Sequence, residues 1–166
     1  LDLSATGRIR IGPSALFEGY LHRNGIDRSR TEEGWFETGD LGAFDGKGRL
    51  LITGRADNMF VSGGENIQPE SIEALLAALP GIVCAVVAPS PHPERVYVPM
   101  ALIAYADGRL PDEKHLASLL SASLPRYMIP WRFLPWPADL AVPAGKIPRR
   151  AVAAWLAAHR VIPDAW

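Results

Sequence analysis

The 166-residue chain has only one cysteine, Cys84, so it cannot form a disulfide within itself. Disulfides are typical of oxidising compartments, and their absence favours the reducing cytoplasm. No apolar run reaches the ~18 residues that a membrane-spanning helix needs, and the first residues carry no secretory signal. We therefore expect a cytoplasmic protein without a membrane span.

The chain also has no excess of charge of either sign. It contains 17 Lys and Arg against 18 Asp and Glu, which gives a formal net charge of -1. A broad nucleic-acid surface needs a basic patch, and this balance argues against one. The histidines, His22, His92, His115 and His159, lack the spacing of metal ligands, and no Ser-His-acid set stands out. We expect neither a nucleic-acid partner nor a metal ligand from the protein.

What the chain does contain is apolar residues (48%) and many turn formers, with 15 Gly and 15 Pro. Residues 1–55 alternate short β-type runs with turns, and Asp45-Gly46-Lys47-Gly48 is typical of a hairpin connection. The expected strands are 8–11, 35–38, 41–44 and 49–53. Because this segment has little helix, it predicts the β-rich edge of a larger domain that is otherwise absent.

Residues 56–166 have a different pattern, in which strands alternate with helices that begin at prolines. The expected helices are 69–79, 111–124 and 148–159. The expected strands are 82–88, 98–105 and 132–134, with a Pro-rich loop between the first two. This alternation predicts an α+β or α/β domain that begins at Arg55 to Asp57.

Three segments could carry chemistry. Gly63 and Gly64 lack the Cβ atoms that would block a thin ligand, and they precede a helix. Lys146 lies between prolines and beside a glycine, where a mobile charge could meet an oxyanion. Asp40 follows a glycine at a strand end, where a carboxylate could bind ribose hydroxyls. Taken alone, each segment also fits an ordinary turn or a solvated loop.

Four motifs in this order resemble the C-terminal third of the adenylate-forming superfamily, which includes acyl-CoA ligases, adenylation domains and luciferases. The motifs are Gly34–Asp40, Gly54–Asn58, Ser62–Glu73 and Gly145–Arg149. The resemblance implies an α+β fold: a small C-terminal lid domain with a three-stranded sheet, helices and a hairpin. Residues 1–55 would then be the end of the large N-terminal domain, and 56–166 the mobile lid.

The resemblance also implies roles for single residues. Asp40 would bind the ribose hydroxyls of ATP, and Arg55 would contact the nucleotide. Asp57 would be the hinge between the domains, and Lys146 would reach the reacting carboxylate during adenylation. After the lid rotates, three residues would help form the tunnel for the pantetheine arm of CoA: Ser62, Gly63 and Gly64.

The activity that follows from the resemblance is acid–CoA ligation, with ATP, Mg²⁺, CoA and a small carboxylic acid as reactants. Within the superfamily, Asp57–Phe60 followed by Ser62–Glu70 is most similar to the o-succinylbenzoate–CoA ligases of menaquinone biosynthesis. Other aryl- or fatty-acyl-CoA ligases, adenylation domains that load a carrier protein and non-catalytic binding domains remain alternatives. The acyl pocket of this family lies in the N-terminal domain, so we expect the chain to be inactive alone. Whether its parent protein is a homodimer is left open.

Overall fold

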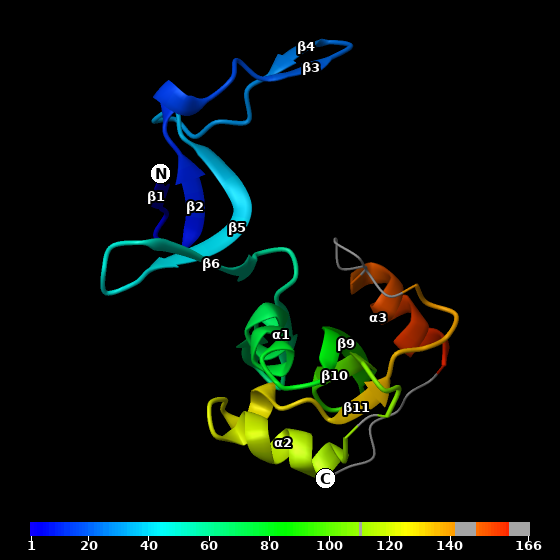
Figure 1. Ribbon diagram of the computed structural model, residues 1–166. Coiled ribbons are helices and arrows are strands. Elements are labelled where there is room, and N and C mark those ends of the chain that lie inside the picture. The colour runs from blue at the N-terminus through cyan, green and yellow to red at the C-terminus, as the bar shows by residue number, and fades with distance from the viewer. Residues whose placement is uncertain (110, 142–148, 160–166) are drawn as a thin grey trace. The chain divides into compact units, whose positions relative to one another are not determined.

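The computed structural model describes residues 1–109, 111–141 and 149–159 (Figure 1). The chain divides into two compact units, Leu1–Asn58 and Met59–Trp166. The expected change from a β-rich to a mixed pattern at residue 55 lies close to this division.

The first unit is built from strands. Its main sheet has the order β1-β2-β5-β6, and β3 and β4 form a separate hairpin. The elements are β1 (Asp2–Leu3), β2 (Arg8–Ile11), the 3-10 helix η1 (Pro13–Ala15), β3 (Tyr20–His22), β4 (Gly25–Asp27), β5 (Phe36–Phe44) and β6 (Leu50–Arg55). The prediction of two separate strands at 35–38 and 41–44 is wrong. They form one strand because pairing with β6 continues through Asp40 and Leu41, with the register shift placed after Leu41.

The hairpin connection between β5 and β6 is confirmed. The Asp45 carboxylate accepts hydrogen bonds from the backbone N–H groups of Lys47 and Arg49, each at 2.9 Å. Gly48 has φ +74°, a backbone conformation that L-residues with side chains rarely adopt. The turn sequence therefore sets this connection locally.

The second unit has a three-stranded sheet with the order β11-β10-β9, in which β9 and β10 are antiparallel and β10 and β11 parallel. A two-stranded hairpin, β7 with β8, precedes the first helix. The elements are β7 (Phe60–Ser62), β8 (Glu65–Ile67), α1 (Pro69–Ala77), β9 (Ile82–His92), β10 (Val96–Tyr105), α2 (Glu113–Ser121), η2 (Arg126–Met128), β11 (Arg132–Pro135) and α3 (Arg149–Ala158). The expected α+β fold of a three-stranded sheet, helices and a hairpin is confirmed.

The helices cover both faces of this sheet (Figure 1). Ile72 and Leu76 of α1 share one apolar core with Leu116 and Leu120 of α2. The α3 residues Val152 and Leu156 belong to a second core, with apolar residues of β9 and β10. Because successive strand residues face opposite sides, the apolar run of β9 supplies both cores, and the sheet is buried between helices.

The Pro-rich loop expected between residues 88 and 98 is wrong, because Pro89 and Pro91 lie within β9, which continues to His92, and β10 begins at Val96. β9 is the last strand of the sheet, and the backbone N–H of Val87 points away from β10, to Glu73. Pro89 and Pro91 lie two and four residues after Val87 in the same strand. A backbone N–H at either position would therefore point in the same direction as that of Val87, toward the open edge. An edge strand tolerates proline in this position.

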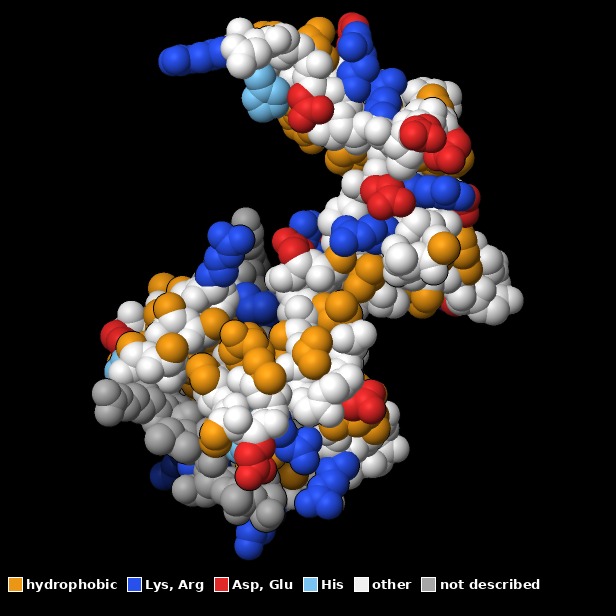
Figure 2. All heavy atoms as spheres, turned by 180° about the vertical axis from the view of Figure 1, so that it is seen from behind, with side chains coloured by type: hydrophobic (Ala, Val, Ile, Leu, Met, Phe, Trp, Pro, Cys, Tyr) orange, Lys and Arg blue, Asp and Glu red, His pale blue; other side chains and the backbone are white. Residues whose placement is uncertain are grey.

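On the face of the molecule seen in Figure 2, basic and acidic side chains are interspersed. Within the described residues, no helix is both long and apolar enough to cross a lipid bilayer.

Candidate functional site

The first part of the site joins two strands of the first unit. Asp40 on β5 lies opposite Arg55 on β6 in the antiparallel ladder. The guanidinium Nη1 of Arg55 donates to Oδ1 of Asp40 at 3.1 Å. Two of the residues that the sequence singled out, 15 positions apart, are thus brought together by the register of one strand pair.

The residues before Asp40 shape this contact. A Cβ atom on Gly39 would lie 2.2 Å from Nη2 of Arg55, so only glycine lets the guanidinium lie against this backbone. The hydroxyl of Thr38 donates to the carbonyl of Ile9 at 2.8 Å and accepts the N–H of Asp40 at 3.1 Å. Thr38 therefore holds the backbone that carries the Asp40 carboxylate, and Gly39 leaves room for the Arg55 guanidinium beside it.

Arg55 also holds Asp57, the expected hinge residue. Its Nε donates to Oδ1 of Asp57 at 2.9 Å, so one guanidinium joins two carboxylates. The hydrogen bond and charge of Asp57, with a smaller contribution from Asp40, raise the pKa of Arg55 above its ordinary value. All three side chains are at least 37% exposed, so this cluster is accessible from solvent.

The glycine motif forms the turn of the β7–β8 hairpin in the second unit. Ser62 is buried, and Phe60 and Ile67 anchor the two strands in the core. Gly63 has φ +57° and donates its N–H to the carbonyl of Arg95 at 3.1 Å. Gly64 has φ +88°, and a Cβ built there would meet no heavy atom within 4 Å. The hairpin tip is thus held at Gly63 and open at Gly64.

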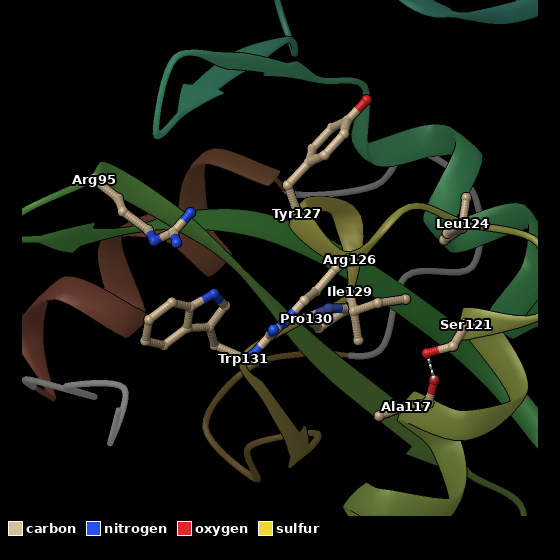
Figure 3. A pocket seen from close by; sticks show the side chains of 9 residues that line it. All are labelled: Arg95, Ala117, Ser121, Leu124, Arg126, Tyr127, Ile129, Pro130 and Trp131. Atoms are coloured by element: carbon tan, nitrogen blue, oxygen red, sulfur yellow. Dashed lines mark hydrogen bonds between the residues drawn. The ribbon is translucent and has the colours of Figure 1, made fainter. Parts of the chain in front are cut away.

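A hollow of about 820 Å³ in the same unit involves the turn that holds Gly63 (Figure 3). Its lining includes Arg95, Arg126, Tyr127 and Trp131. The guanidinium carbon of Arg95 lies 5.7 Å from the centre of the Trp131 ring. A lining that combines two arginines with aromatic rings suits a ligand that carries phosphates and a flat base.

The sequence patterns did not predict this hollow. Arg95 comes from the β9–β10 turn, whereas Arg126 is the first residue of η2 and Trp131 follows η2. No local motif links these segments, so only their packing brings the lining together.

Lys146 lies outside the described residues, so its expected role in adenylation remains a proposal. Among the residues that the structure describes, no three His, Cys, Asp or Glu side chains group together as metal ligands.

No protein-family model matches the chain. It is 37% identical over 143 residues to the 2-succinylbenzoate–CoA ligase of Salmonella typhimurium, an alignment that covers 86% of this chain and 31% of that ligase. Wild-type E. coli MenE, solved with an analogue of OSB-AMS, superposes with a TM-score of 0.79 at 31% identity, covering 93% of this chain and 33% of MenE. In both sequence and backbone, this chain is similar to part of the adenylate-forming acyl-CoA ligases.

The expected resemblance to the C-terminal region of these acyl-CoA ligases is confirmed, including the similarity to the o-succinylbenzoate enzymes. A second acyl-CoA ligase, the indoleacetate–CoA ligase of Aromatoleum aromaticum, is 35% identical over 126 residues, which cover 76% of this chain and 25% of that enzyme. The chain spans about a third or less of the length of these relatives.

Proposed function

We propose that this chain is the C-terminal part of an ATP-dependent acid–CoA ligase that acts on o-succinylbenzoate. The observation that carries the proposal is the match to 2-succinylbenzoate–CoA ligase at 37% identity over 86% of the chain. The match to MenE in backbone, which covers 93% of the chain, supports the same assignment.

The first half-reaction would use the Asp40–Arg55 pair and Lys146. A carboxylate oxygen of the acid attacks the α-phosphorus of ATP, and the bond to the β-phosphate breaks to release pyrophosphate. Asp40 would accept hydrogen bonds from the ribose hydroxyls. Arg55 would give up part of its contact with Asp40 and contact the nucleotide instead. Lys146 would place positive charge where negative charge gathers in the transition state. Mg²⁺ would arrive with the phosphates of ATP.

The second half-reaction would use the glycine hairpin. After rotation about Asp57, the CoA sulfur attacks the acyl carbon, the bond to AMP breaks, and the thiol proton leaves to solvent. The open tip at Gly64 has room for the pantetheine arm. The hollow with Arg95 and Arg126 would bind the phosphate-bearing end of CoA. One lid would thus serve two reactions in succession.

The large N-terminal domain is proposed from the relatives, which are about three times as long as the matched region. The β5–β6 hairpin is consistent with such a domain, because Phe44 and Ile52 are 51% and 71% exposed in this chain. Apolar side chains on one face of a sheet are ordinarily covered by another layer. The acyl pocket would lie in that domain, so we predict that the chain alone activates no acid.

Ligases for other acids are similar to this chain as well, among them a 2-methylpropanoate–CoA ligase at 33% identity and a long-chain-fatty-acid–CoA ligase at 31%. The similarity to indoleacetate–CoA ligase, at 35% identity, is nearly as high as that to 2-succinylbenzoate–CoA ligase. The residues proposed to contact ATP and CoA would serve steps that all such ligases share, so they do not separate one acid from another. A cytoplasmic location remains part of the proposal.

The test is acid-dependent ATP–pyrophosphate exchange, followed by thioester formation, with the full-length ligase that contains this chain. The acids would be o-succinylbenzoate, indoleacetate, benzoate and a medium-chain fatty acid. We expect the highest kcat/KM with o-succinylbenzoate. A higher value for another acid would refute the substrate, and no exchange with any acid would refute the activity. Lys146→Ala should abolish exchange but retain thioester formation from supplied acyl-adenylate.

A further inference from the structure

Arg149, the first residue of α3, is tied to the first turns of α1. Its Nη2 donates to Oε2 of Glu73 at 3.0 Å and to Oε1 of Glu70 at 3.2 Å, and its Nη1 donates to Oε1 of Glu73. The side chains of Arg149 and Glu73 are only 12% and 8% exposed. This is a nearly buried, two-pronged ion pair between residues 76 positions apart.

The same ion pair closes the open edge of the sheet. The backbone N–H of Val87 donates to Oε1 of Glu73 at 2.6 Å, and its carbonyl accepts from Nη1 of Arg149 at 3.2 Å. Val87 belongs to β9, the edge strand, so these side chains take the place of a neighbouring strand. Because α1 and α3 pack into different cores, the contact also links the two helical layers around the sheet edge.

Stability alone is a weak explanation for such a pair. Burial raises the pKa of Glu73 above its ordinary value, and the hydrogen bonds from Arg149 and Val87 oppose the shift. Removing two charges from water is costly, and well-packed apolar residues often replace a buried ion pair without loss of stability. An apolar pair does not fix the relative orientation of its two side chains. The planar guanidinium does so, because it forms several oriented hydrogen bonds with its partner.

Arg149 stands three residues after Lys146 in the chain. Covalent geometry keeps the Cα atoms of these two residues within roughly 11 Å of each other. The contacts of Arg149 therefore anchor the chain three residues after Lys146. We propose that Arg149 and Glu73 are positioning residues that set where Lys146 is delivered during adenylation. This inference rests on the proposed role of Lys146.

Conservative variants in the full-length ligase test the proposal, because truncation of either partner would leave a buried charge alone. Arg149→Lys retains the charge but loses the two-pronged geometry, and Glu73→Gln retains the shape but loses the charge. Arg150→Lys is the matched control, since Arg150 is the exposed next residue of the same helix. Each variant is assayed for ATP–pyrophosphate exchange and, separately, for thioester formation from supplied acyl-adenylate and CoA.

We expect Arg149→Lys and Glu73→Gln to lower the kcat of exchange by roughly 10- to 100-fold, the effect of a misplacement near 1 Å. Thioester formation should stay within about twofold of the parent enzyme, because Lys146 acts only in adenylation. The KM for ATP should change little, and Arg150→Lys should leave both steps unchanged.

Two results would overturn the inference. One is an equal loss in both half-reactions, which is the signature of a residue that only holds the fold together. The other is unchanged exchange in both variants while Lys146→Ala abolishes it. If Lys146→Ala itself leaves exchange intact, the proposed role of Lys146 is wrong, and the inference that depends on it is wrong as well. The Lys146→Ala result therefore separates a failure of the proposed function from a failure of the positioning role.

Discussion

Replacement of Gly64 by leucine tests the glycine hairpin as the path of the pantetheine arm. Gly64 has φ +88°, and a Cβ there would meet nothing within 4 Å. Gly108, in the connection after β10, offers a matched control in the same unit, with φ +73° and equally open surroundings. A leucine at either position strains the backbone in the same way and collides with no neighbour.

The magnitudes follow from this match. A side chain in the left-handed region costs about 1–2 kcal/mol, and no steric term adds to it at either position. For a chain of this size, each kcal/mol lowers Tm by about 2–4 °C, so both variants should melt roughly 2–8 °C lower. Only Gly64→Leu puts four carbons into the proposed path of CoA. We expect its kcat/KM for CoA to fall roughly tenfold or more, which corresponds to about 1.4 kcal/mol.

The assay is thioester formation from supplied acyl-adenylate at varied CoA in the full-length ligase. ATP–pyrophosphate exchange in the same preparation reports whether adenylation is intact, and it should be unchanged in both variants. The reasoning is refuted if Gly64→Leu and Gly108→Leu lose the CoA step equally, since backbone strain would then account for the whole effect.

Three further predictions concern other contacts. Gly39→Ala should raise the KM for ATP roughly tenfold in exchange assays, because its Cβ would lie 2.2 Å from Nη2 of Arg55 and displace the guanidinium from Asp40; an unchanged KM would argue against the pair. Burial holds the pKa of Glu73 above its ordinary value of 4.5, so the unfolded chain releases this proton first as pH rises. The free energy of unfolding should therefore fall between pH 4.5 and that raised pKa, and Glu73→Gln should remove this part of the slope in urea titrations; parallel slopes would contradict the shift. Leu76→Ala, in the fully buried core beneath α1, should cost about 2–5 kcal/mol in urea unfolding, and a cost below about 1 kcal/mol would mean that this core is loosely packed.

Much of the secondary structure followed from short-range patterns. Pro69 marks the first residue of α1, and Asp112 caps α2 by accepting the N–H of His115 at 3.2 Å. These signals act over three or four residues, through backbone sterics and local hydrogen bonds, so the neighbouring sequence suffices. The same local reading failed at Pro89 and Pro91. Whether a strand tolerates proline depends on its place at the sheet edge, which no local pattern reveals.

For the candidate site, the sequence by itself determined which residue types are present and in what order, and those motifs were enough to indicate the superfamily. Only the tertiary structure decided what each residue meets. Register places Arg55 opposite Asp40, and layer packing brings Arg149 to Glu73 from 76 positions away. The hollow beside Arg95 likewise exists only because a strand turn and a 3-10 helix pack together. Contacts of this kind depend on the arrangement of whole elements, whose spacing in the chain carries no record of their spacing in the folded protein.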